Sequence, residues 1–350
     1  MNDRRIDLLD SFRFIAVTGV LLYHYTYRWA VPSTGGRVVP YGTYFGSLFR
    51  LGALGPHFFF IISGFVISLT LERNSGPSGF ARNRFARLFP ALLSCTLITF
   101  LVCLGLDKDN IFPSAHQAIN LLPSLTLVSP ATWNFFGVHG LAWVNGSYWS
   151  LWTEIQFYAL SALCFFAGRR HYARHMLWVT AWVSAISLVP QWGAFSDAFN
   201  VVYYMPFFML GILFYQLYQR QGRGHLAIVC MLFLFLSIRS PDTPTICAYA
   251  FMIGLFLLLI YRQSWLRLLD NRLFRRIGVI SYTAYLIHEN VGVVLIHAYG
   301  RTLGAFSPFI VTALVLVFSE CSFRWYEQPL SRLLKRRGPK LLASDPEHLI

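Results

Sequence analysis

The stretch SFRFIAVTGVLLYHYTYRW, residues 11–29, combines an apolar segment of membrane-spanning length with two ionisable side chains, Arg13 and His24. A transmembrane helix needs about 20 mainly apolar residues. Eleven residues at 100° each bring a helix back to within about 20° of the same face, and they place His24 about 16 Å above Arg13. Ionisable groups inside a bilayer are costly and usually line a cavity or pathway. The pattern predicts a functional membrane helix, with a purely structural role for the pair as the alternative.

The rest of the chain has the same apolar character. Of its 350 residues, 56% are hydrophobic and only 13% are charged, with a mean hydropathy of +0.51. The first stretch is no cleavable signal peptide, because it carries internal Arg and His and many similar segments follow it. The composition predicts an all-α polytopic membrane protein, a bundle of about ten transmembrane helices. These spans are expected near residues 12–30, 52–72, 88–106, 148–168, 175–190, 201–218, 225–239, 245–261, 277–298 and 305–325.

The net charge of +14 follows the ends of these spans. With ten spans both termini lie on one side, and that side holds 23 of the 29 Lys and Arg residues. The positive-inside rule makes this side cytoplasmic. We therefore interpret the basic balance as topology, and we expect no nucleic-acid partner. The other basic residues are Arg28, Arg37, Arg50, Lys108, Arg239 and Arg301.

Residues 119–147 are apolar but interrupted by Pro123, Pro130 and several glycines. Treating them as a span would turn the later Arg-rich linkers outward, so we expect one external or re-entrant segment. Neither His139 nor the Asn145 sequon within it is predicted to be functional. The expected organisation is a membrane domain over residues 1–330 and a short basic cytoplasmic tail over 331–350, with no additional soluble domain.

The six cysteines lie singly in apolar segments without metal-ligand spacing. We expect them to be small core side chains, and we predict neither a metal site nor a disulfide framework.

Three ionisable groups from different spans are predicted at a similar depth. Counted from the cytoplasmic edge, His24 lies at about 18 Å, His288 at about 16 Å and Glu154 at about 21 Å. Such a layer is able to carry out acid–base chemistry.

Polar residues also fall on single stripes of their helices. Such stripes can lock neighbouring helices together by hydrogen bonds, but together they predict a polar cavity. In the second span, Ser63 and Gly64 are small enough to let a backbone or a ligand approach closely. The stripes are Ser281, Tyr285 and His288 in one span and Ser150, Glu154 and Tyr158 in another.

On the cytoplasmic side, ARNRFARLFPALL at residues 81–93 places Arg84 and Arg87 at i, i+3. A pair of planar guanidinium groups suits phosphate, through bidentate charge-assisted hydrogen bonds. The alternative is a topology determinant that touches lipid headgroups. Together with Arg13 at nearly the same depth, the pair predicts a cytoplasmic mouth for an anionic substrate.

These motifs resemble the integral-membrane acyltransferase-3 family along nearly the whole chain. Arg13 and His24 match its R-x10-H pattern, and Arg84 and Arg87 match its RxxR pattern. FFFIISGF at 58–65, SYWSLWTEIQFYAL at 147–160 and SYTAYLIHE at 281–289 are similar to its further signatures. The resemblance implies transfer of an acyl group, commonly acetyl from acetyl-CoA, to a sugar hydroxyl in a surface polysaccharide, lipopolysaccharide, peptidoglycan or glycosylated natural product. It also implies a multi-pass protein of a bacterial plasma (inner) membrane.

The resemblance and the helix geometry together give a mechanism as a hypothesis. Arg13, Arg84 and Arg87 bind the phosphates of acyl-CoA, a co-substrate rather than a tightly bound cofactor, while its phosphopantetheine arm extends up to His24. His24 is the general base or a transient acyl carrier. The acceptor is a sugar or glycolipid reaching His24 from the outer side. The remaining predicted site residues are Glu154, which orients His24 or the sugar, and a positioning group of Ser63, Ser281, Tyr285 and His288.

Two other functions are compatible with the pattern. A proton-coupled secondary transporter would use the buried His and Glu residues as a proton relay. It predicts internal repeats, and none is visible in the sequence. A non-enzymatic envelope scaffold explains the hydrophobicity but gives the ionisable layer no purpose.

Overall fold

The computed structural model describes residues 3–29, 48–189, 192–219, 224–240 and 242–336, and within these ranges the chain forms helices joined by turns, without a strand. Five stretches are long and apolar enough to cross a membrane, namely residues 50–72, 77–106, 201–218, 243–261 and 272–335. The prediction of an all-α protein with several membrane-spanning helices is thereby confirmed. A helix coincides with each of the ten predicted spans: α1 (Asp3–Tyr23), α3 (Gly55–Glu72), α4 (Pro77–Leu106), α7 (Trp149–Ala167), α8 (Tyr172–Ile186), α10 (Val201–Tyr218), α11 (Gly224–Ile238), α12 (Thr243–Tyr261), α13 (Arg272–Leu303) and α14 (Ser307–Ser322).

Two helices differ from the expected spans in ways that affect the site. α4 begins at Pro77, so the charged turns around Arg84 and Arg87 belong to the same helix as the apolar segment. A hydropathy pattern stops at the charged residues, whereas backbone hydrogen bonding continues through them. α1 ends at Tyr23 and continues as a π-helical turn, η1 (His24–Arg28). π-helical turns are rare in proteins, and those that occur often lie at functional sites. This one begins at His24.

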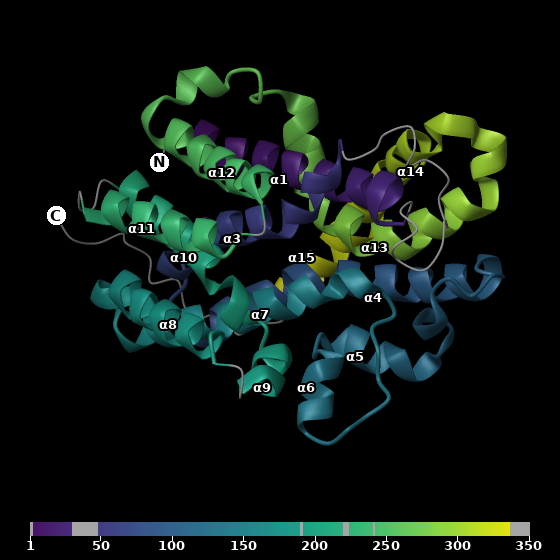
Figure 1. The fold of residues 1–350 in the computed structure, drawn as a ribbon, viewed down its shortest axis with the longest axis horizontal. Helices are drawn as coiled ribbons and strands as arrows, with labels where there is room; N and C mark the ends of the chain where they lie inside the picture. The colour runs from purple at the N-terminus through teal and green to yellow at the C-terminus, as the bar shows by residue number, and fades with distance from the viewer. Residues whose placement is uncertain (1–2, 30–47, 190–191, 220–223, 241, 337–350) are drawn as a thin grey trace.

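The segment 119–147 forms only short helices. α5 (Leu121–Thr126) and α6 (Pro130–Phe135) have six residues each, and a 3-10 turn, η6 (Gly146–Tyr148), leads into α7. Six residues extend only about 9 Å, so the prediction that this segment is not a span is confirmed. In Figure 1, α5 and α6 lie with α9 (Gly193–Ala198) along the lower edge, opposite α12. Asn145 is fully buried, which makes it a structural residue rather than a glycosylation site.

The helices that carry the candidate residues pack against one another. α1 contacts both α13 and α3, and α13 also packs against α4 and α14. α7 contacts α3, α4 and α10 (Figure 1). The five helices α1, α3, α4, α7 and α13 therefore bring segments from most of the chain to one place.

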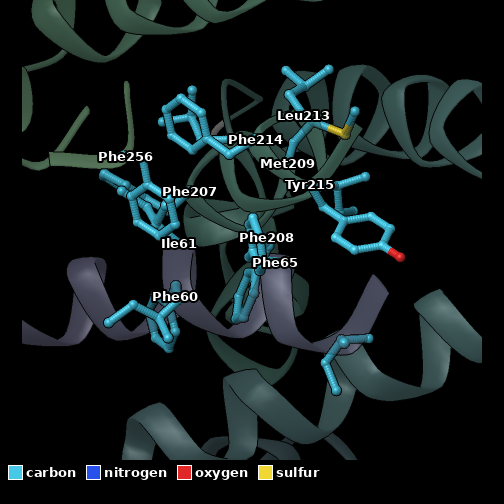
Figure 2. Close-up of a cluster of buried hydrophobic side chains, with 14 of the residues drawn as sticks. Phe60, Ile61, Phe65, Phe207, Phe208, Met209, Leu213, Phe214, Tyr215 and Phe256 are labelled. Atoms are coloured by element: carbon cyan, nitrogen blue, oxygen red, sulfur yellow. The ribbon is translucent and has the colours of Figure 1, made fainter. Parts of the chain in front are cut away.

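α3 and α10 pack closely against each other. Figure 2 shows aromatic side chains of α3 and α10 interleaved, with Phe256 of α12 beside them. Gly64 lies against the backbone of α10, and a Cβ at this position would come within 2.1 Å of the Phe208 carbonyl oxygen. Of the two predicted roles of Gly64, close approach of a backbone or of a ligand, the structure shows the first.

An ion pair at the start of α12 joins this helix to the turn before α3. Asp242 accepts a hydrogen bond from the backbone N–H of Thr245 at 2.9 Å, which caps α12, and pairs with Arg50 at 2.8 Å. Hydrogen bonds from Thr245 and from the Arg50 guanidinium lower the pKa of Asp242 to about 2. The carboxylate is therefore charged at neutral pH and holds the turn before α3 against α12.

The cysteines agree with the prediction only in part. All six cysteines are free thiols. Cys95 and Cys103 are buried, as expected for core side chains, but Cys230 and Cys247 are exposed on their helices and do not belong to a core.

The beginning of the predicted tail is helical. It forms α15 (Gln328–Arg336), which packs on α4. Residues 337–350 lie outside the described residues.

Candidate active site

Most of the predicted site residues meet in one cavity, which we call the arginine cavity. It has a volume of about 80 Å³ and lies between α1, α3, α4, α7 and α13. The two predicted stripes face it, except for His288. The predicted residues that line it are Arg13, Ser63, Arg84, Arg87, Ser150, Glu154, Tyr158, Ser281 and Tyr285.

Two of its three cations, Arg13 and Arg84, have different partners. Arg13 forms a hydrogen-bonded ion pair with Asp10, one turn earlier on α1. Arg84 donates from Nη2 to the Thr70 hydroxyl at 2.7 Å, and its guanidinium lies over the rings of Phe80 and Tyr158. Its buried Nε–H has no hydrogen-bond partner among the described residues. The cavity thus holds a donor that an anionic ligand can satisfy.

Glu154 lies among these cations and not beside His24. Its carboxylate accepts hydrogen bonds from Ser63 Oγ at 2.7 Å and from the hydroxyl of Tyr158. Glu154 was predicted to orient the ring of His24 or to position the sugar. Its carboxylate does not contact that ring and is bound by Ser63 and Tyr158 instead. A depth counted along a helix gives a height only, and the rotation of α7 directs this side chain into the arginine cavity.

His24 lines a second cavity of about 330 Å³, which we call the histidine cavity. Glu289 lies beside it there, with 3.6 Å between His24 Nε2 and Glu289 Oε1. The exposed fractions of the two side chains are 14% and 10%. Gly146 borders this carboxylate, since a Cβ at this position would lie 3.4 Å from Glu289 Oε2. An imidazole and a carboxylate thus share a small, largely buried space.

The other face of His24 is held by the backbone and by His288. His24 Nδ1 lies 3.0 Å from the Val20 carbonyl oxygen and 3.2 Å from His288 Nε2. His288, which is fully buried, has its Nδ1 2.6 Å from the Tyr285 carbonyl oxygen. A carbonyl can only accept, so each neutral ring carries its proton on Nδ1. His24 Nε2 is then left with a free lone pair in the histidine cavity.

Tyr285 and Pro56 line both cavities and so form the boundary between them. The Tyr285 hydroxyl donates to the Ser147 carbonyl at 3.1 Å and accepts from Ser150 Oγ at 2.8 Å. Asn145 holds this turn in place, because it donates to the Leu286 carbonyl at 3.0 Å and accepts from the backbone N–H of Ser147. The boundary side chain is therefore rigidly placed.

Three contributors to the site were not among the predicted site residues. Glu289 and Tyr282, which lines the arginine cavity, both lie within SYTAYLIHE. The signal for Glu289 was its position directly after His288, but adjacent residues on a helix point about 100° apart. Only the packing of α1 against α13 shows that His288 lies behind His24 while Glu289 lies beside it. Asn145 was noted only for its sequon, which gives no sign of its hydrogen bonds to Leu286 and Ser147.

Comparisons with known proteins relate the chain to acyltransferases. A family model described as an acyltransferase domain matches residues 6–320. A Staphylococcus aureus (strain COL) protein named "Putative O-acetyltransferase" is 24% identical over 99% of this chain, which spans 60% of that relative's length. Acyltransferase MdmB of Streptomyces mycarofaciens is 24% identical over 87% of both chains. An O-acetyl transferase of Shigella phage Sf6 is 29% identical over 44% of both. No solved structure matches the chain.

Proposed function

The chain belongs to the acyltransferase-3 family, and on that premise we propose that it transfers an acetyl group from acetyl-CoA to a hydroxyl of a sugar or glycolipid acceptor. The observation that carries this proposal is the free Nε2 of His24, which shares the histidine cavity with Glu289. The names of the Staphylococcus and phage relatives support acetyl as the group transferred. The secondary transporter loses its support, because the family match is to acyltransferases.

The phosphates of the donor bind at the arginine cavity. They accept hydrogen bonds from Arg84 and Arg87, while Arg13, neutralised in part by Asp10, adds a third guanidinium. Charge-assisted hydrogen bonds to phosphate are among the strong ones in proteins. The pantetheine arm runs past Tyr285 and Pro56 into the histidine cavity, over a distance comparable to the rise of about 16 Å from Arg13 to His24.

The acceptor hydroxyl lies in the histidine cavity. Its oxygen attacks the thioester carbonyl carbon while its proton moves to His24 Nε2. The carboxylate of Glu289 at 3.6 Å stabilises the positive charge that this proton brings. The C–S bond then breaks, and the thiolate of CoA takes the proton from His24. If His24 is instead acylated first, the same Nε2 is the nucleophile.

The polar residues of the arginine cavity and of its boundary with the histidine cavity position the reactants. Ser63 and Tyr158 fix Glu154, and Ser150 fixes the hydroxyl of Tyr285. Ser281 donates to the Gly278 carbonyl and lines the arginine cavity. We assign these residues to the passage of the arm, in the plasma membrane of a bacterium with both termini cytoplasmic.

The test uses the whole protein in phospholipid nanodiscs. Free thiol from acetyl-CoA and label transferred to an added glycan acceptor are measured for wild type, His24→Ala and His139→Ala. We expect His24→Ala to lower kcat by about 10²- to 10⁴-fold and to leave acetyl-CoA binding intact. His139, exposed in the segment 119–147, is the control. Wild-type rates in His24→Ala remove His24 from the mechanism. Label that the wild-type protein carries without acceptor, that acid or hydroxylamine removes and that His24→Ala lacks would identify the acyl-His24 route.

A further inference from the structure

An apolar groove of about 530 Å³ lies between α4 and α7, and the end of α5 forms part of its wall. Along α4 its lining extends from Pro77 to Leu92, which corresponds to about 22 Å of helix. Phe85 and Leu163, which are 52% and 69% exposed, are part of this wall. α4 is long and apolar enough to span a bilayer, so we expect the Leu92 end of the groove to lie in hydrocarbon and Arg84 to lie near the bilayer edge.

The groove is continuous with the arginine cavity. Arg84, Leu88 and Tyr158 line both spaces. Arg84 is the one charged residue among the described residues that line the groove. Its Nη2 is bound to Thr70, but its buried Nε–H has no partner in the described part of the chain. The lining of the apolar groove thus includes Arg84, whose Nε–H is a hydrogen-bond donor that no described residue satisfies.

We propose that this groove binds an anionic phospholipid of the membrane. One acyl chain lies along α4 between Arg84 and Leu92, against Leu127 of α5, and a phosphate oxygen accepts the hydrogen bond from Arg84 Nε. The described residues that line the groove include no carboxylate that could pair with a choline headgroup, so a net anionic lipid is preferred to a zwitterionic one.

This lipid shares a guanidinium with the donor. Arg84 also lines the cavity in which the acetyl-CoA phosphates bind, a step that rests on the proposed function. Because one side chain serves both ligands, bound anionic lipid lowers the affinity for acetyl-CoA. The composition of the surrounding membrane then controls how well the donor binds.

The first experiment counts lipids. The full-length protein in nanodiscs of equal phosphatidylglycerol and phosphatidylcholine is released into mild detergent, and retained lipids are measured by native mass spectrometry. Ala162→Trp narrows the groove from α7, and Ala81→Trp narrows it from α4. Ala313→Trp, on an exposed face of α14, is the matched control. We expect both groove variants to lose about tenfold of the retained phosphatidylglycerol, as burial of a few methylene groups predicts, and Ala313→Trp to retain it. If the groove variants fold and retain as much phosphatidylglycerol as Ala313→Trp, the groove is not the lipid site.

The second experiment tests the headgroup. Arg84→Gln should reduce the ratio of retained phosphatidylglycerol to phosphatidylcholine about tenfold, the effect of one hydrogen bond to a charged group. An unchanged ratio overturns the assignment of the phosphate to Arg84. Glycerol phosphate, which has the headgroup anion without chains, should not displace the lipid. Displacement by it would show a site for free phosphate instead.

The third experiment links the lipid to the donor. In phosphatidylglycerol nanodiscs acetyl-CoA should bind Ala162→Trp more tightly than wild type, and in phosphatidylcholine nanodiscs the two should bind equally. Equal binding in both membranes contradicts the competition. Lipid retention needs no acyl transfer, so the first two experiments keep their meaning if the proposed function fails.

Discussion

The rings of His24 and His288 meet edge to face, with centroids 4.7 Å apart and 3.2 Å between His24 Nδ1 and His288 Nε2. Since the Tyr285 carbonyl oxygen lies 2.6 Å from Nδ1 of His288, the Nε2 of that ring is an acceptor and keeps the proton of His24 on Nδ1. His288 is therefore a positioning residue for His24, and it does not line either cavity.

Replacing His288 should impair turnover and leave donor binding intact. His288→Ala removes the acceptor behind His24, so kcat should fall about tenfold, the effect of one lost hydrogen bond, while the KM for acetyl-CoA stays the same. His288→Gln retains an acceptor oxygen and should recover part of the rate. Steady-state kinetics of the three proteins measure this split, and equal losses in Ala and Gln variants would indicate a packing role only.

Glu289→Gln should slow the chemical step. The substitution keeps the size of the side chain but removes the charge 3.6 Å from His24 Nε2. Because that charge stabilises the imidazolium formed in the transition state, kcat should fall about 10²-fold. Single-turnover label transfer is the measurement. Glu154→Gln is the comparison, since Glu154 contacts Ser63 and Tyr158 instead of His24; a larger rate loss in Glu154→Gln would reverse the two roles.

The double variant Arg84→Gln/Arg87→Gln should weaken acetyl-CoA binding by about 10²-fold or more, because each guanidinium lost removes a hydrogen bond to a charged group. The KM for the acceptor should not change. Isothermal titration of acetyl-CoA into detergent-solubilised protein measures the affinity. Arg82→Gln provides the control, because Arg82 is exposed on the same helix and lines neither cavity. Unaltered acetyl-CoA affinity in the double variant would disprove the donor site.

Gly64→Ala should destabilise the protein. The added Cβ would meet the Phe208 carbonyl oxygen at 2.1 Å and the Gly211 Cα at 3.1 Å, and both belong to the backbone of α10. Forcing these helices apart costs about 1–3 kcal/mol. Thermal unfolding in detergent should show a lower midpoint for this variant than for Gly254→Ala, whose added methyl group meets no atom within 4 Å. Matching midpoints would show that α3 and α10 can separate without cost.

Much of the fold followed from local properties of the chain. Apolar length and charge placement predicted a helix at each of ten positions, and the interrupting prolines of residues 119–147 predicted a segment that does not span. Arg13, Arg84 and Arg87 were expected near one another and do line one cavity. Hydropathy, however, placed the start of α4 too late, because helical hydrogen bonding continues past the bilayer edge.

The sequence by itself determined which residues form helices and which stripe of each helix is polar, because hydropathy and the period of 3.6 residues are properties of one segment. Only the tertiary structure decided that Glu289 rather than Glu154 lies beside His24, and that His288 lies behind it. These contacts depend on how α1, α7 and α13 are rotated and how closely they approach. Gly278 shows the reason, since a Cβ there would lie 1.8 Å from the Asp10 carbonyl oxygen of α1, so backbone contact sets the position of α13.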